Sequence, residues 1–348
     1  GVSYDITQDF TVDDIKSKSI VSNQLTAENV VDIAAGTSTY TTPTEASVHR
    51  IKLAYDNLQC DEATPATTTI GLNVDGVSVP ITTINKANSD AYYTVGANNI
   101  NYIPETGELI LGENVFAAIQ NADKISVSYA KESFEVGDLR PEHYFDCTKH
   151  AIQSDGTVKD TVFTQPEGGQ DLNYEVNFSQ TVTVNTEGKD VITHNMGNAI
   201  LDMAQAVQDV LDAESMKTKL TAMLGDSTYS SNSAAVGRIN KMLEDIDIEL
   251  ALKKENMQSL FGANTTNFKD YISDVTAQQS KSATRSNTLD LISERVTEQY
   301  ANFKELMSSN EDIETEEAII AYNQAEQVYN LALSATANVI QKTLLDYM

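Results

Sequence analysis

The chain has 348 residues, with 23 Lys and Arg against 51 Asp and Glu, so its formal net charge is −28. This acidity argues against nucleic acid and anionic membrane surfaces as partners, because both are bound through clustered positive charge. The hydrophobic content of 41% is that of a folded protein, and the length suits two or three domains.

The sequence predicts no disulfide framework, secretion signal or membrane span. The two cysteines, Cys60 and Cys147, are too few for a disulfide framework. The chain does not open with a basic segment followed by an apolar one, so no cleavable secretion signal is predicted. Its apolar runs are shorter than the ~20 residues that a membrane-spanning helix needs, so no membrane span is expected.

Residues 1–136 are predicted to form a β-rich domain. The dipeptide Asp75-Gly76 lies between alternating apolar positions, which is typical of a tight hairpin. The segments 98–104 and 108–111 flank a Glu-Thr-Gly turn and predict a second hairpin.

The β character continues beyond this domain. KISVSYA (124–130) alternates like a strand with one buried face, whereas ENVFAAIQN (113–121) predicts one short helix. Within 137–196, the segment 172–185 predicts a small hairpin. Its first strand carries Tyr174, Val176 and Phe178 on one face, and its second strand carries Val182 and Val184 on another line.

From about residue 197 the apolar spacing becomes helical. Residues 197–224 predict a first long helix, and the Ser- and Asn-rich stretch 226–233 predicts a loop. A further helix is predicted over 265–308. No Gly or Pro occurs after Gly262, so very long helices are permitted.

Residues 236–262 carry a narrower apolar pattern. Ile239, Leu243, Ile246 and Leu250 follow one another at spacings of four, three and four. This ladder is typical of a coiled-coil seam rather than of a broad globular face.

The last helix is predicted over 313–348. The stretch SSNE (308–311) predicts its start, with Ser308 or Ser309 as the N-cap. Apolar residues cover more than one face of this helix, so it needs more than one partner. Those predicted to form a subunit interface are Ile319, Ile320, Tyr322, Ala325, Val328, Tyr329, Ala332, Leu333, Val339, Ile340, Leu344 and Leu345.

Two interpretations of this helix stay open. It is either buried in the protein's own bundle or packed against other subunits. Its position at the end of the chain favours the second. Together the segments predict an α+β fold with four parts: 1–136, 137–196, 197–312 and 313–348.

The stretch PEHYFDCTKH (141–150) is the strongest candidate for chemistry. His143, Asp146, Cys147 and His150 would converge on a metal ion only if this stretch were helical, and Pro141 could begin such a helix. A Cys–His nucleophile lacks any surrounding catalytic signature. Tyr144 and Phe145 are expected to pack at a domain junction, and Cys147 to be a buried thiol. We therefore predict no catalytic, cofactor-binding or metal-ligating residues, and no enzyme.

Three segments resemble flagellar hook-associated proteins, which belong to the flagellin superfamily. They are LRPEHYFDC (139–147), LNYEVNFSQTVTVNTEGKDVITHN (172–195) and, most strongly, 289–348 with SSNEDIETEEAIIAYNQAEQVYNLAL and a terminal LLDYM. The likeness covers about 137–348, and residues 1–135 resemble the variable outer domain of such proteins.

The resemblance implies a structural protein of the bacterial flagellum that forms a ring between hook and filament. It implies secretion through the flagellar export apparatus without a cleaved signal peptide. The partners implied are further copies of the chain, neighbouring hook-associated proteins and flagellin, and an export chaperone before secretion. Residues 1–136 would be the exposed outer domain, and 313–348 the inner assembly helix.

The family also has an N-terminal helical arm, which nothing before Gly1 supplies here. The terminal helix is therefore expected to be poorly ordered or domain-swapped in the isolated chain. Two other functions remain as alternatives. A flagellin-type subunit would form long filaments by itself, and a metal-dependent enzyme would retain metal at 143–150.

Overall fold

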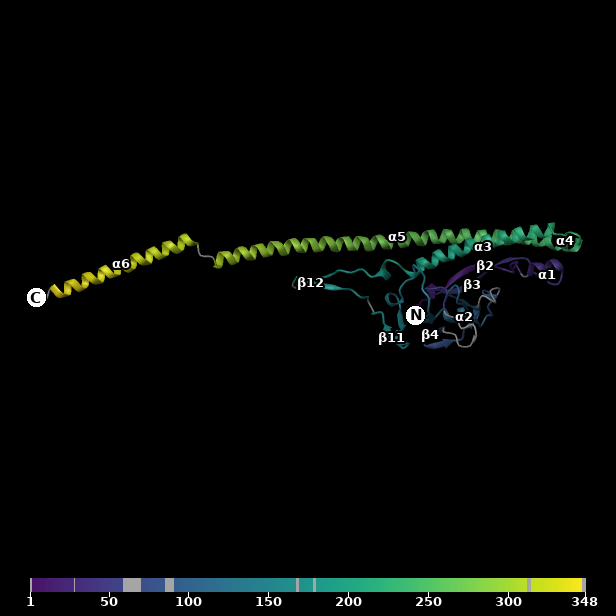
Figure 1. Cartoon of the computed structure of the whole chain (residues 1–348), viewed down its shortest axis with the longest axis horizontal. Coiled ribbons are helices and arrows are strands. Elements are labelled where there is room, and N and C mark those ends of the chain that lie inside the picture. Colours follow the sequence, from purple (N-terminus) through teal and green to yellow (C-terminus); the bar gives the residue numbers. More distant parts are fainter. Residues whose placement is uncertain are drawn as a thin grey trace. The chain divides into compact units, whose positions relative to one another are not determined.

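The computed structural model describes residues 2–27, 29–58, 70–84, 91–166, 169–177, 180–311 and 314–345, without the side chains of 177 and 338–345 (Figure 1). The chain divides into two compact units. The first unit comprises 1–172 and 185–280, and the second comprises 173–184 and 281–348. Both sheets and long helices are present, which confirms the predicted α+β class.

A six-stranded antiparallel sheet forms one layer of the first unit. Its strands, in spatial order, are β11 (Val158–Phe163), β10 (Asp146–Ile152), β1 (Val2–Phe10), β9 (Ile125–Lys131), β4 (Gly71–Val74) and β5 (Val77–Val79). Tyr4, Ile6 and Phe10 are buried, while Asp5 and Thr7 between them are exposed. This alternation gives the sheet one core face and one solvent face.

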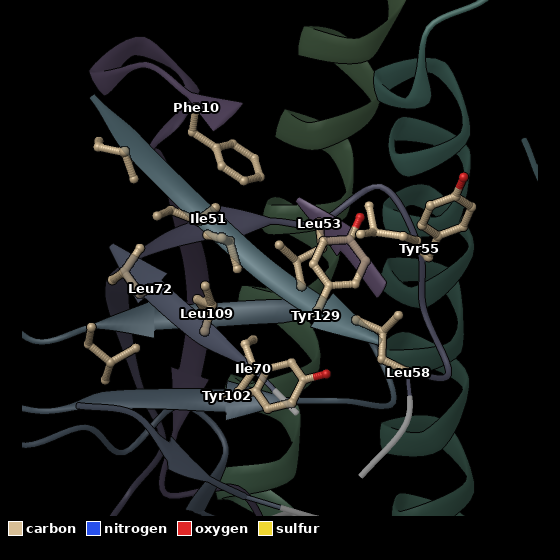
Figure 2. Packing of buried hydrophobic residues seen from close by; sticks show 14 of the residues in the cluster. Phe10, Ile51, Leu53, Tyr55, Leu58, Ile70, Leu72, Tyr102, Leu109 and Tyr129 are labelled. Carbon is tan, nitrogen blue, oxygen red and sulfur yellow. The ribbon is translucent and has the colours of Figure 1, made fainter. Parts of the chain in front are cut away.

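A five-stranded sheet faces the same core. Its order is β2 (Lys16–Ser22), β3 (Thr44–Lys52), β8 (Glu108–Leu111), β7 (Ile100–Ile103) and β6 (Thr82–Thr83). Side chains of both sheets belong to one hydrophobic cluster, including Leu72 and Tyr129 of the first sheet and Ile51 and Leu109 of the second (Figure 2).

Both predicted hairpins of this region are confirmed. Strands β4 and β5 pair around Asp75 and Gly76, whose φ angles of 51° and 85° suit the primed turns of tight hairpins. Strands β7 and β8 pair across the Glu-Thr-Gly turn. Gly107 has φ of 63° there, and a Cβ atom at this position would lie 2.0 Å from the Tyr55 carbonyl oxygen. The predicted strand over 124–130 is β9, and the short helix is α2 (Glu113–Ile119).

The first sheet continues across residue 136. Strand β10 pairs with β1 on the side opposite β9, and β11 pairs with β10. Pro141 begins only a single 3₁₀ turn, η3 (Pro141–His143), before the chain enters β10. Phe145 is buried in the sheet core and Tyr144 packs against that core. Both lie inside the first unit, whereas they were predicted to pack at a domain junction.

Helices complete the first unit. A second hydrophobic cluster joins α1 (Asn29–Ala35), α3 (His194–Gly225) and the beginning of α5 (Ser233–Glu311). Ile239 and Ile246 of the predicted coiled-coil ladder are fully buried, and Leu243 and Leu250 pack against the same cluster.

The helix boundaries differ from the prediction in two places. The segments 236–262 and 265–308, predicted as separate helices, form the single helix α5, which contains no Pro and accommodates Gly262 at the junction. The predicted N-cap at Ser308 or Ser309 is wrong, since both residues lie inside α5. A cap forms only where the backbone leaves the helix, and α5 continues to Glu311. The predicted loop 226–233 contains the short helix α4 (Ser227–Ser230).

The second unit contains a hairpin and helical segments. Strands β12 (Asn173–Asn177) and β13 (Gln180–Thr183) form the predicted hairpin. Tyr174 and Val182, predicted on separate lines, are direct cross-strand partners, and Phe178 lies outside the described residues. The unit also holds α5 from residue 281 and helix α6 (Thr315–Leu345).

Candidate assembly surface

The end of α5 displays an apolar stripe. Every side chain from Ser293 to Glu311 is exposed. Val296, Tyr300, Phe303 and Met307 follow at spacings of four, three and four, which places them on one helix face. Tyr300 and Phe303 are 71% and 70% exposed, so nothing in the described chain covers this face.

Helix α6 is exposed in the same way. All side chains described from Glu314 to Ala337 are exposed, including Ile319, Tyr322, Val328 and Tyr329. Ile320, Ala325, Ala332 and Leu333 of the predicted interface are exposed as well. The side chains of Val339, Ile340, Leu344 and Leu345 lie outside the described residues.

The sequence of α6 does not suit a helix surrounded by water. Residues 327–341 contain no Asp, Glu, Lys or Arg. A solvated helix normally carries charged residues, often in pairs three or four positions apart. Acidic residues instead occupy the first turn, where Glu316 and Glu317 complement the helix dipole. The uncharged stretch 327–341 is typical of a helix that has packing partners.

We name the large apolar side chains that are exposed on α6 and on α5 from residue 293 onward the assembly surface. On α5 they are Val296, Tyr300, Phe303, Leu306 and Met307, and on α6 they are Ile319, Ile320, Tyr322, Val328, Tyr329, Leu331 and Leu333. Leu331 and the α5 residues were not among the predicted interface residues. Their signal was present in the sequence as helical spacing, but spacing alone does not tell a bundle face from a subunit face.

One contact attaches the small hairpin to α5 within the second unit. Arg295 donates a hydrogen bond of 3.0 Å from Nη2 to Oε1 of Gln180. Among the described residues of this unit, the buried apolar side chains are Val182 and Ile292, at 9% and 8% exposure. An isolated two-stranded hairpin is marginally stable. The hydrogen bond from Arg295 therefore supports the hairpin.

The 141–150 stretch does not form the helix that a metal site there would need. Asp146 to His150 lie in strand β10, so Asp146 and Cys147 point to opposite faces. His150 bonds Asp160 through Nδ1 at 2.7 Å and Asp5 through Nε2 at 3.1 Å. No group of three or more His, Cys, Asp and Glu in the described part of the chain is placed to hold a metal ion.

Cys147 has the surroundings of a core residue. It is 5% exposed, as expected, and lies opposite Ile6 and Phe163 on the neighbouring strands. Burial, followed by the charges of Glu142 and Asp146, raises the pKa of its thiol to about 11. A thiol with so high a pKa is protonated at neutral pH and is a poor nucleophile.

Comparison of the chain with protein-family models, with curated proteins and with solved structures found no match. Among the helices of the described residues, none combines the length and apolarity that a bilayer crossing requires.

Proposed function

We propose that the chain is a structural subunit that assembles through the helices of its second unit. The observation that carries this proposal is that every side chain of 293–311 and 314–337 is exposed in the single chain. Burying one large apolar side chain is worth roughly 1.5–3 kcal/mol, so covering the assembly surface with other subunits would provide a substantial driving force. An isolated helix gains little stability from propensity alone.

We further propose that this subunit belongs to the bacterial flagellum and joins hook to filament. This step is supported by the resemblance of 139–147, 172–195 and 289–348 to hook-associated proteins. In that role the chain is secreted, forms a ring with further copies of itself, and contacts a neighbouring hook-associated protein and flagellin. An export chaperone covers the apolar helices before secretion.

The test compares two pairs of substitutions on α6. Tyr322→Ser with Tyr329→Ser removes two aromatic side chains one heptad apart, whereas Asn323→Ser with Asn330→Ser changes the adjacent, polar line. Sedimentation velocity over a concentration series should show oligomers for the unmodified chain and the asparagine pair, and monomers for the tyrosine pair. Equal sedimentation of both pairs contradicts assembly through this surface.

The flagellar role has its own readout. Bacteria that lack the protein should keep their hooks, lose their filaments and release flagellin into the medium. Loss of filaments without released flagellin would favour the flagellin alternative, as would long filaments formed by the purified chain alone. Normal filaments would overturn the flagellar assignment while leaving self-assembly untouched.

A further inference from the structure

One face of α3 is attached to the β part of the first unit by polar side chains. His194, Asn198 and Asp202 recur every four residues, so they share a helix face. We call these three residues the α3 seam. They lie at the start of the helix, which begins at His194.

Each residue of the α3 seam bonds a different part of the β region. Asn198 donates from Nδ2 to the carbonyl oxygen of Leu53 at 3.0 Å, and its exposure is only 8%. Asp202 forms an ion pair with Arg50 of β3. His194 Nε2 lies 3.2 Å from Gln8 Nε2 on β1. Of these three bonds, that of His194 depends on the protonation of its ring near neutral pH.

The hydrogen bonds around Gln8 determine the protonation state of His194. Gln8 Oε1 lies 3.0 Å from the backbone nitrogen of Ala54 and 3.0 Å from the hydroxyl oxygen of Tyr129. A backbone N–H can only donate, so this atom of Gln8 is the carbonyl oxygen and the other is the amide NH₂. The amide donates to His194, whose Nε2 must therefore be unprotonated. His194 is thus the neutral tautomer with its proton on Nδ1.

The surroundings of His194 favour this neutral form. Burial lowers its pKa, and the charge of Asp14 in the 3₁₀ turn Val12–Asp14 opposes this effect more weakly. The Asp14 carboxylate is already engaged by the backbone and hydroxyl of Thr11 at 2.8 and 2.7 Å. Two further neighbours are uncharged: Gln8 on β1, and the ring of Phe145 with its centroid 5.7 Å away. A cation at the first residue of α3 would also face the positive end of the helix dipole.

We propose that the bond between His194 and Gln8 is an acid-released latch: neutral His194 holds the start of α3 against β1, and protonation of the ring releases it. A proton on Nε2 places two donors against each other, because Gln8 cannot turn its amide without losing the bonds from Ala54 and Tyr129. The ion pair of Asp202 persists, so the opening is confined to the first turns of the helix.

The direction of the pH effect follows from linkage. The latch contributes its full stability above the pKa of an unfolded histidine, about 6.5. As the pH falls from there toward the lower folded-state pKa, the unfolded form binds more protons and the contribution is lost. Within that window the opening equilibrium constant rises up to about tenfold per pH unit.

Nitrogen-15 NMR of the imidazole rings in the full chain tests the latch directly. The chain has four histidines, so the signals are few. We expect His194 to show a protonated Nδ1 and an unprotonated Nε2 at neutral pH, and to titrate below the value of a free histidine. A proton on Nε2 at neutral pH, or titration at or above the free value, would overturn the proposal.

Hydrogen exchange on variants tests the consequence. Protection of the amides of 198–202 should fall on acidification in the unmodified chain. His194→Gln, which keeps an acceptor for Gln8 but does not titrate, should make that protection independent of pH. The matched control His150→Gln changes a histidine with carboxylate partners and should leave the acid release unchanged. Acid release that persists in His194→Gln contradicts the latch, and the imidazole signals decide the matter if this variant does not fold.

Discussion

Helix α5 carries the same apolar spacing twice, with opposite outcomes. Ile239, Leu243, Ile246 and Leu250 follow at four, three and four positions, and Val296, Tyr300, Phe303 and Met307 repeat those intervals. The first set packs into a cluster with α1 and α3, with Ile239 and Ile246 fully buried. The second set is exposed throughout. Spacing defines a helix face, but only a partner buries it.

The difference has an energetic meaning. The first set contributes to the stability of the folded monomer, because its side chains leave water when the unit folds. The second set contributes nothing until another surface covers it. Substitutions in the two sets should therefore affect different measurements, unfolding in one case and association in the other.

The largest expected effect concerns a buried charge in the first unit. Glu108 is 1% exposed and accepts from Lys18 Nζ at 3.0 Å and from the hydroxyl of Tyr93 at 3.0 Å, and it also pairs with Arg50. Glu108→Gln removes the buried carboxylate that Lys18 and Arg50 share, and among the described residues only Arg50 keeps a second carboxylate partner, Asp202. Breaking a buried ion pair in this way costs about 3–5 kcal/mol. Chemical unfolding should show this loss.

The control for this prediction is Glu113→Gln, which changes an exposed carboxylate in the first turn of α2. It should cost no more than about 1 kcal/mol, the value of a dipole interaction at the surface. If Glu108→Gln lost as little stability as Glu113→Gln, Lys18 and Arg50 would have found other partners. The prediction that the buried carboxylate matters more than the exposed one would then be wrong.

The next effect compares the two apolar sets directly. Ile246→Ala should destabilise the monomer by about 2–5 kcal/mol, since it removes a fully buried side chain from a packed cluster. Phe303→Ala, at an exposed position of the same helix, should change monomer stability by less than about 0.5 kcal/mol. Thermal or chemical unfolding in dilute solution measures both. A large loss in Phe303→Ala would mean that a partner already covers this face.

Local signals explain which parts of the fold were predictable. Asp75, Gly76 and Gly107 have positive φ angles, which Gly adopts freely and Asp tolerates. The residue types alone therefore predict these turns. The alternation of Ile125, Val127 and Tyr129 likewise identifies a buried strand face. The N-cap predicted at Ser308 or Ser309 failed because these residues suit a helix start only if the preceding helix has ended. Nothing local ends α5 there.

Long-range contacts explain what the sequence did not reveal. In the sequence Glu108 is an ordinary acidic residue next to a turn. Its burial depends on Arg50 and Lys18, which are 58 and 90 positions away. The α3 seam is equally hidden, since Gln8 and His194 are 186 residues apart. The assembly surface was predictable as a helix face, and the partner that covers it remains a prediction.

The smallest effect distinguishes His150 from His194, two of the four histidines of the first unit. His150 lies opposite Asp160 on β11 and also bonds Asp5, and these side-chain hydrogen bonds raise its pKa. A raised pKa gives stability that is complete below the unfolded value near 6.5 and is lost as the pH rises through the folded value. His194 acts in the reverse direction, because burial lowers its pKa.

Because the pKa of His150 is raised, the difference in stability between the unmodified chain and His150→Gln should be larger at pH 6 than at pH 8. We expect about 0.2–1 kcal/mol, as for an exposed ion pair. Chemical unfolding of both proteins at the two pH values measures it, and an equal difference at both would show that the carboxylates do not hold His150 in its charged form.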